Sequence, residues 1–481
     1  MDDPTDSLLI SPNSVLANAL LRTIDMIRPR IAARAPRSIT FVVGTQINGA
    51  PHLGTGIVQT AAFLLARAAR RAFSIDTRVL FSALDNAPHD VIVDPESFHA
   101  YQKVYAHALG PQGVDELIDK HYRSFFESLF DLTDAEYSIE TYTDQQADDV
   151  FRQTFVETVT RLDDIRWWLA PSHGTVHIRI PCPHCDWAEK RSERTKLVDI
   201  EGSQARFEAV CLDHGPYEAS IGPGTGNYLD LSTLYRNLVK ERVFAQDEST
   251  LYVMVKGGDW SFGCQLVDGA HAALGTDMRA IPPRIFSPMV LADTGAKLSK
   301  SLIREQHDAA LPEGVEPWML DTSRWSAGID NYVDSLAWLV DAVMSDPKHF
   351  YRSFTTKELG RLMENRPNFG DQPRARDMAI YKKYFDQIAT GDKTIEVRVG
   401  YSSMKRIKPG QLLRFVCRDE SCLTKVIRVA TYSTFEEMFT AEDPDAVNPG
   451  QDVTSQIQEI RRIFPRDKEA LGVIAIEIEK V

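Results

Sequence analysis

The chain has 481 residues, of which 43% are hydrophobic and 25% are charged, and its formal net charge is −14. Length and composition predict a large globular enzyme of two to four domains. The net charge argues against a surface that coats nucleic acid broadly, although a local basic patch would still hold RNA or phosphates. The apolar run 61–69 is too short for a membrane span, and residues 1–4 lack the basic start of a secretory signal, so we expect a cytoplasmic protein without a membrane partner.

The first predicted elements are a helix over 15–27, which Pro29 should end, and a strand over 39–43. After the strand, Pro51-His52-Leu53-Gly54 leads into an Ala/Leu-rich helical pattern over 56–73. A helix start offers unpaired N–H groups and the positive end of the helix dipole, while Gly54 lets a flat ligand lie against the backbone. This order of elements predicts an anion-binding turn.

A second motif, Lys297-Leu298-Ser299-Lys300-Ser301, lies far downstream and follows a loop over 292–296. His52 would bond phosphate oxygens as charge builds on them, and Lys297 and Lys300 would neutralise leaving pyrophosphate. Either motif alone is a weak signal, because most such His and Lys residues are surface or packing residues. Together the two motifs predict ATP-dependent activation of a carboxylate.

The two motifs are similar to the HIGH and KMSKS signatures of class I aminoacyl-tRNA synthetases. Within that class the resemblance is to the class I lysyl-tRNA synthetases, and it covers roughly residues 35–310, with similar stretches at 45–50, 82–86, 121–126, 256–260 and 267–271. It implies a doubly wound α/β domain of Rossmann type that binds ATP with Mg²⁺ outside the carboxyl ends of parallel strands. The product would be an aminoacyl-adenylate.

The residues expected at the ATP site are catalytic His52, Lys297 and Lys300, with Gly54, Thr55 and Ser299 as nucleotide contacts. The resemblance further places Asp268, Gly269 and His271 near the ribose. Thr55 stands where the family usually has His or Asn, a change that keeps a hydroxyl near the phosphates and removes an imidazole or amide.

Lysine is the amino acid that the resemblance implies. Its cationic side chain would need carboxylate or aromatic partners, for which Asp85, Asp259 and Trp260 are candidates. The two acids would serve equally well as strand-end caps. Gln46 would orient the substrate amine, and Asn48 in the same stretch is a further candidate for amino acid binding.

The cysteine spacing predicts a structural metal site. Cys182-Pro183-His184-Cys185 and Cys211-Leu212-Asp213-His214 are two knuckles separated by a stretch suited to a hairpin, as in a zinc ribbon. Four protein ligands, Cys182, Cys185, Cys211 and His214, would leave no open position, so the Zn²⁺ would be structural. The alternative is buried thiols with His184 or His214 as a loop residue. In the related synthetases a zinc insertion occupies the same place between the two signatures.

Only the stretch 311–372 separates the lysine motif from a different module, so the large anticodon-reading domain of the family is missing. A turn-rich segment, 365–373, predicts the boundary. Beyond it, helices and short β-rich runs predict a small β-barrel: helices over 378–390 and 455–463, and strands over 394–399, 411–416, 424–432 and 472–479.

Residues 379–398 resemble ASCH domains, relatives of the PUA-like RNA-binding barrels, with Lys393, Glu396 and Arg398 at the central signature. Strand alternation places Glu396 and Arg398 on one face, with Lys393 at the strand entrance. Some ASCH relatives hydrolyse acylated nucleosides, which would make Lys393 and Glu396 catalytic, and others only bind nucleic acid. The alternative is an ordinary cross-strand ion pair.

The predicted domain order is a first part of the catalytic domain over 1–170, a zinc ribbon over 171–225, a second part of the catalytic domain over 226–310, a short helical connector over 311–372 and an ASCH-like domain over 373–481. The predicted function is activation of an amino acid and its transfer to tRNA, as in a lysyl-tRNA synthetase. One alternative is a tRNA-independent ligase that modifies a nucleoside, small molecule or other carrier. The other is a non-catalytic RNA-binding paralogue.

Overall fold

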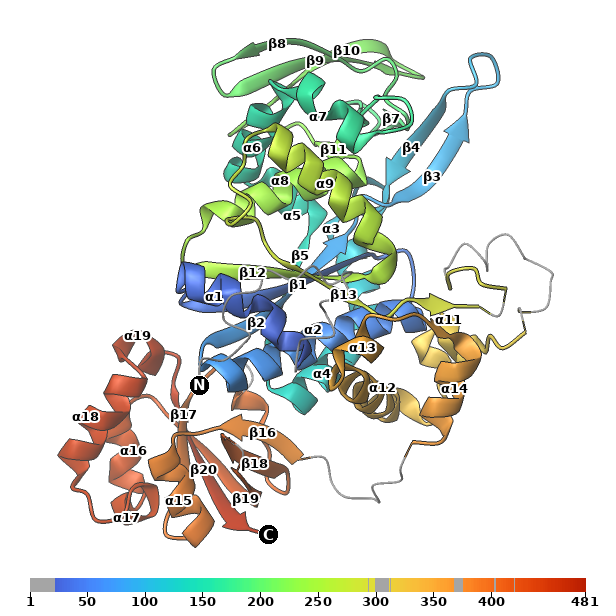
Figure 1. The fold of residues 1–481 in the computed structure, drawn as a ribbon. Coiled ribbons are helices and arrows are strands. Elements are labelled where there is room, and N and C mark those ends of the chain that lie inside the picture. Colours follow the sequence, from blue (N-terminus) through green and yellow to red (C-terminus); the bar gives the residue numbers. More distant parts are fainter. Residues whose placement is uncertain are drawn as a thin grey trace. The chain divides into compact units, whose positions relative to one another are not determined.

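The computed structural model describes residues 22–292, 294–298, 311, 313–366, 375–401, 404–418 and 420–481 (Figure 1). The described residues divide into two compact units, one drawn from the described parts of 22–128 and 137–366 and the other from those of 129–136 and 375–481. Within the described ranges, no helix combines the length and apolar character that a membrane crossing requires.

The first unit is built on a five-stranded sheet with the order β13-β12-β1-β2-β5. β1 is central and pairs in parallel with β2 on one side and with β12 on the other. The strands are β1 (Ser38–Gln46), β2 (Asp76–Leu84), β5 (Glu136–Thr141), β12 (Thr250–Gly257) and β13 (Arg284–Ser287). The predicted α/β fold is confirmed, and its switch point lies outside the carboxyl ends of β1 and β12.

Helices cover both faces of this sheet, with α2 (Leu53–Phe73) and α12 (Gly328–Met344) on one side and α8 (Thr233–Gln246) and α9 (Ser261–Ala273) on the other (Figure 1). Val42 of β1 and Met254 of β12 are paired neighbours, and both pack against Phe244 of α8. Side chains alternate along a strand, so every second residue from these two positions also faces α8.

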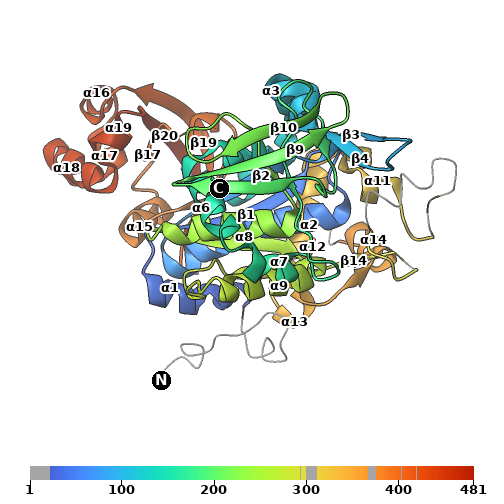
Figure 2. The same ribbon diagram turned by 90° about the horizontal axis from the view of Figure 1, so that it is seen from above.

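A long insertion separates β2 from α8. Its elements are β3 (Pro88–Val93), β4 (Ala100–Val104), α3 (Tyr105–Ile118), α4 (Ser124–Thr133), β5, α5 (Tyr142–Ala147), α6 (Asp149–Val159), α7 (Leu162–Leu169), β6 (Ile178–Arg179), β7 (Ala188–Glu189), β8 (Lys196–Glu201), β9 (Gln204–Cys211), β10 (Gly215–Ile221) and β11 (Asp230–Leu231). β8, β9 and β10 form an antiparallel sheet, which lies nearest the viewer in Figure 2.

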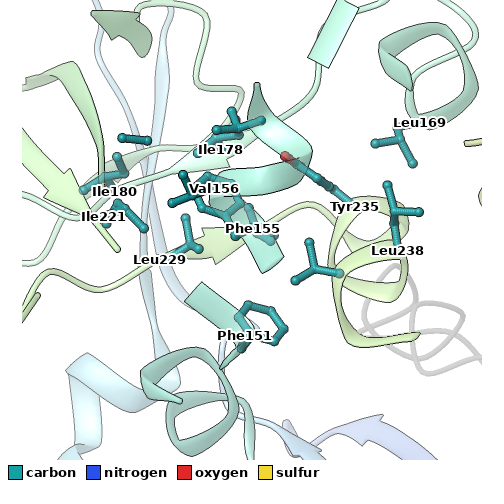
Figure 3. Packing of buried hydrophobic residues seen from close by; sticks show 14 of the residues in the cluster. Phe151, Phe155, Val156, Leu169, Ile178, Ile180, Ile221, Leu229, Tyr235 and Leu238 are labelled. Atoms are coloured by element: carbon teal, nitrogen blue, oxygen red, sulfur yellow. The ribbon is translucent and has the colours of Figure 1, made fainter. Parts of the chain in front are cut away.

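The insertion and α8 share one hydrophobic core. Phe155 of α6, Ile178 of β6 and Ile221 of β10 pack in the same buried cluster as Tyr235 and Leu238 of α8 (Figure 3). The apolar side chains of α8 are therefore buried against the insertion, and the position of α8 depends on the folding of that insertion.

The start of the described chain corrects one prediction. Thr23–Ile27 forms a 3₁₀ turn, and the α-helix that follows is α1 (Arg28–Arg34). Pro29 lies in the first turn of α1, where the proline nitrogen replaces an N–H that a helix start does not use. Pro29 therefore begins a helix instead of ending one, and residues 15–21 of the predicted helix lie outside the described part.

The remaining elements of the first unit begin with the strand β14. They are β14 (Val290–Leu291), α11 (Pro317–Leu320), α12, α13 (Pro347–Phe350), β15 (Phe354–Thr355) and α14 (Thr356–Glu364). α12 packs on α2 at Gly56, where an added Cβ would lie 3.2 Å from Leu336 and from the Tyr332 hydroxyl. α12 thus supports the helix that follows the His52 turn.

The second unit is an open sheet with the order β16-β18-β19-β20-β17, in which β16 and β17 are the edges of the described sheet. Its elements are β16 (Ala375–Ala379), α15 (Lys382–Thr390), β17 (Ile395–Val399), β18 (Leu412–Cys417), β19 (Glu420–Tyr432), α16 (Phe435–Ala441), α17 (Pro444–Val447), α18 (Val453–Ile463), α19 (Arg466–Glu469) and β20 (Val473–Lys480). β20 alternates Ile474 and Ile476 into one core and Val473 and Ala475 into another, so both faces of the sheet are covered.

Candidate functional site

A cavity of about 490 Å³ opens at the carboxyl ends of β1 and β12, at the switch point of the sheet. This volume is within the range of small-molecule sites in proteins. Several predicted site residues line it, namely Gln46, Asn48, His52, Gly54, Thr55, Asp259, Trp260 and Lys297. The cavity therefore brings together residues of the segments 46–55 and 259–297, which are far apart in the sequence.

His52 is the N-cap of α2. Its Nδ1 accepts a hydrogen bond from the Thr55 N–H at 3.3 Å, and its Nε2 lies 3.1 Å from the Thr55 hydroxyl. An added Cβ at Gly54 would lie 3.1 Å from the His52 ring and 3.7 Å from Val290. A side chain at position 54 would crowd the imidazole, so the glycine gives the ring its place at the helix start.

The turn before α2 is anchored by Tyr122, to which the sequence assigned no role. The buried Tyr122 hydroxyl lies 3.2 Å from the Gln46 carbonyl oxygen and 3.0 Å from that of Gly49. One side chain from the insertion thus fixes both ends of the turn. The only sequence signal was the place of Tyr122 within the aromatic stretch 121–126.

Lys297 forms an ion pair with Asp259, and both side chains line the cavity. The segment after β14 holds Lys297 in place through a bridge between Lys297 and Leu291. Two further predicted residues, Ser299 and Lys300, lie outside the described residues. Asp259 was predicted to bind the amino acid side chain, and the structure gives its carboxylate a cationic partner, Lys297.

Three residues predicted at the ribose, Asp268, Gly269 and His271, do not line the cavity. Asp268 pairs with Arg284, and the fully buried His271 lies 3.5 Å from the Glu241 carboxylate. An added Cβ at Gly269 would lie 2.2 Å from the Trp168 ring. These residues hold α9 against its neighbours, and the geometry gives no support to a ribose contact from them.

Asp85 is also removed from the cavity lining. Its carboxylate accepts hydrogen bonds from the Thr143 N–H at 3.1 Å and from the Thr143 hydroxyl at 2.5 Å. Burial raises the pKa of Asp85 to about 6, against the effect of these hydrogen bonds. Asp85 thus follows the end of β2 and caps the start of α5.

The sequence assigned no role to a polar group on the α8 side of the cavity. Arg236, Asn237 and Lys240 of α8 and Lys256 of β12 line it, together with Gln59 of α2. Both amide atoms of Gln59 are buried without a hydrogen-bond partner among the described residues. Gln59 is far from the others in sequence, and the only signal available for α8 was that charged and polar residues are interspersed with apolar ones.

The predicted metal ligands converge. The donor atoms of Cys182, Cys185, Cys211 and His214 all lie within 4.8 Å of one another. Three of the separations are 3.7 Å (Cys182 Sγ to His214 Nδ1), 3.4 Å (Cys185 Sγ to Cys211 Sγ) and 3.5 Å (Cys211 Sγ to His214 Nδ1). A tetrahedral zinc site with ordinary bond lengths has edges of about 3.4–3.8 Å. The donor set therefore fits a tetrahedral ion, with the second knuckle at the β9–β10 turn.

In the second unit, Lys393 is buried and its hydrogen bonds are used within the fold. Lys393 Nζ donates to the carbonyl oxygens of Ile395 at 2.7 Å and Val447 at 2.6 Å, and lies 3.4 Å from Glu396. Arg398 pairs with the other Glu396 oxygen at 2.9 Å. Burial lowers the pKa of Lys393, and Glu396 opposes that effect. This arrangement favours the ion-pair interpretation of the Lys393 signature.

We expect Lys393→Met to destabilise the second unit by about 3–5 kcal/mol, because it removes one of the two cationic partners of the buried Glu396 carboxylate and leaves two buried carbonyls without their donor. Hydrogen exchange of β17 in the full chain measures this free energy. Lys383→Met is the matched control, since the ion pair of Lys383 with Glu459 is on the surface and should contribute less than about 1 kcal/mol. Equal protection of β17 in the two variants would contradict a structural role for Lys393.

Comparisons with known proteins identify one domain, which lies in the second unit. Residues 378–481 match the profile of the ASCH domain family, so the predicted ASCH domain is confirmed. Two solved structures are similar to this part at 31% identity: the hypothetical protein PH0355 (22% of this chain, 97% of that chain, TM-score 0.21) and Protein PF0455 from Pyrococcus furiosus (22%, 96%, TM-score 0.20). The Mycobacterium tuberculosis methionyl-tRNA synthetase in complex with methionyl-adenylate is similar at 12% identity, over 68% of each chain, with a TM-score of 0.34. No curated protein matches this chain.

Proposed function

We propose that this protein uses ATP to activate the carboxylate of an amino acid as an aminoacyl-adenylate. The observation that supports this most strongly is the cavity at the sheet switch point, which brings His52, Thr55 and Lys297 together from segments far apart in the chain. Phosphoryl chemistry needs such groups to be positioned before charge develops.

In the proposed reaction a carboxylate oxygen of the amino acid attacks the α-phosphorus of ATP, and the bond from that phosphorus to the β-phosphate bridging oxygen breaks. Pyrophosphate leaves with the electron pair. His52 and the α2 start would bind phosphate oxygens, and Lys297 would leave Asp259 to neutralise the departing pyrophosphate. Mg²⁺ bound with ATP would supply further neutralisation, mostly through phosphate and water ligands.

We propose a structural Zn²⁺ at Cys182, Cys185, Cys211 and His214, since four protein donors leave no open coordination position. The ion would tie the β9–β10 turn to the loop before β7. Its contribution would be to the fold of the insertion and not to the reaction.

For the acceptor of the activated amino acid, we propose tRNA, with a small nucleoside-containing molecule as the second candidate. The ASCH domain supports a nucleic acid or nucleoside acceptor, because its PUA-like relatives bind RNA. Charging of total tRNA with the activated amino acid would distinguish the two. Amino-acid-dependent pyrophosphate exchange without formation of any acylated tRNA would favour the small nucleoside-containing molecule as the acceptor.

We expect purified protein to catalyse amino-acid-dependent exchange between labelled pyrophosphate and ATP. The experiment tests each proteinogenic amino acid separately, including the lysine that the sequence predicts, and omits the amino acid as a control. Binding of a non-hydrolysable ATP analogue is measured in the same preparation. Analogue binding without exchange for any amino acid would rule out adenylate formation with these substrates and favour a non-catalytic paralogue.

A further inference from the structure

The α8 side of the cavity holds three cations, Arg236, Lys240 and Lys256, here named the cation triad. Arg236 and Lys240 are 6% and 5% exposed, so two of the three charges are almost completely buried. Buried charges are normally paired with opposite charges, because removing an ion from water is costly. The contacts of the triad therefore need an explanation.

Neutral groups are the direct contacts of the triad. Arg236 donates to the Asn86 side-chain oxygen at 3.0 Å, and Lys256 donates to that of Asn237 at 2.9 Å and lies 5.5 Å from the centre of the Trp260 ring. Lys240 has no hydrogen bond to any described residue, and no described carboxylate lies within ion-pair distance of the three. The fold thus assembles three basic side chains at the cavity and gives none of them a described carboxylate as a direct partner.

The cation triad lies on the opposite face of the sheet from His52 and Thr55 at the start of α2. Lys256 lies two residues after Met254 on β12, so strand alternation turns it toward α8, and its hydrogen bond to Asn237 agrees. His52 and Thr55 are on α2, on the opposite face. Position 44 of β1, which also faces α8, is a glycine that lines the cavity, and an added Cβ there would lie 3.2 Å from the Ser82 carbonyl oxygen. An elongated substrate would reach from the reacting groups to the triad past Gly44.

We propose that the amino acid activated here has an acidic side chain, whose anionic group binds Arg236, Lys240 and Lys256 while its α-carboxylate reacts at the His52 side. This inference rests on the proposed function and specifies its substrate. A lysine substrate would place an ammonium group among three cations and gain only repulsion, so the triad is at odds with the lysine prediction. An anion would supply the missing charge and accept hydrogen bonds from all three residues.

Pyrophosphate exchange with L-glutamate, L-aspartate, O-phospho-L-serine, L-glutamine and L-lysine tests the proposal. We expect at least one of the three acids to support exchange, and L-glutamine and L-lysine to be poorer substrates than the best acid by about 10-fold or more. Comparison of L-glutamate and L-aspartate with O-phospho-L-serine shows whether the side-chain anion is a carboxylate or a phosphate. Exchange with lysine and with none of the acids would overturn the inference and leave adenylate formation intact.

Lys240→Met, which keeps the side-chain length and removes the charge, should lower kcat/KM for the acid by about 10- to 100-fold and leave the KM for ATP unchanged. Its melting temperature should equal or exceed that of the parent, because a buried like-charge contact is removed. Lys196→Met, at an exposed position of β8, is the control and should change neither kcat/KM for the acid nor the melting temperature. An increase in the KM for ATP alone would assign the triad to ATP phosphates and overturn the inference.

Titration calorimetry of the three acids without ATP distinguishes failure of this inference from failure of the proposed function. If no amino acid supports exchange, adenylate formation is wrong, and acid binding that Lys240→Met abolishes would still establish the anion site. Absence of acid binding by the parent protein would overturn the inference whatever the exchange assay gives.

Acid binding should also take up a proton. Burial, together with Lys256 and Arg236, lowers the pKa of Lys240 to about 7, against the opposing effects of Glu241 on α8 and Glu140 on β5. A bound anion would raise that pKa, so at pH 7.5 the protein should take a proton from the buffer. Calorimetry in HEPES and in Tris, two buffers with different enthalpies of ionisation, measures the uptake as a difference in enthalpy. An equal enthalpy difference between the two buffers in Lys240→Met would contradict the assignment of the proton uptake to Lys240.

Discussion

His52→Ala should lower the rate of amino-acid-dependent pyrophosphate exchange by about 100-fold, the usual effect of removing one donor that stabilises developing charge. The His52 ring lines the cavity at the start of α2, where it would contact the phosphates of ATP. Steady-state exchange rates at saturating ATP measure the loss. An unchanged rate would show that the imidazole does not act on the phosphates.

His52 is also a helix cap, so the alanine variant changes two properties at once. Loss of the hydrogen bond from the Thr55 N–H should destabilise the first unit by about 1 kcal/mol. His52→Asn provides the matched control, because asparagine is a good N-cap and lacks the imidazole. We expect both variants to lose exchange and only His52→Ala to lose stability. Recovery of exchange in His52→Asn would assign the effect of alanine to the cap alone.

His214→Ala should abolish stoichiometric zinc binding, whereas His184→Ala should retain it. Both histidines lie at the metal site and their rings are 5.2 Å apart, but only His214 belongs to the converging donor set. Losing one of four ligands should weaken affinity by more than about 100-fold, since even groups outside the coordination sphere contribute up to that amount. Metal analysis after gel filtration gives the zinc content of each variant.

The zinc-free His214→Ala protein should also unfold more readily in the insertion, since metal binding energy is folding energy for such small sites. Hydrogen exchange of β9 and β10 is expected to increase, with β18 and β19 of the second unit as internal controls. Full zinc content in His214→Ala together with loss in His184→Ala would exchange the roles of the two histidines. Absence of zinc from the parent protein would remove the metal assignment.

Local patterns predicted the elements near the His52 turn accurately. The apolar run 39–43 lies within β1, and the helical pattern over 56–73 lies within α2. In the second unit, the run 394–399 corresponds to β17 and 455–463 to α18. These elements were predictable because the period of their apolar residues matches the face that each element buries.

The cation triad could not be predicted in the same way. Arg236 and Lys240 are one helical turn apart, and in sequence such a pair is typical of a solvated helix face. Their burial results from contacts of α8 with β12 and the insertion, which are tertiary contacts over long sequence separations. The contacts of Asp268 and His271 could not be predicted either, because a motif resemblance does not indicate which face of α9 meets Arg284 and Glu241.

The pairing of β1 with β12 has a consequence for how the protein is made. Ser38 lies beside Thr250, 212 residues later in the chain, so the two strands that border the cavity are synthesised far apart in time. At ribosomal speeds of about 5–20 residues per second, β1 waits about 10–40 s for its second neighbour. During that interval one edge of β1 has no strand partner from β12, and exposed edges promote aggregation. Folding of the insertion on the emerging chain would shorten the search, because it brings α8 and then β12 back to the waiting edge.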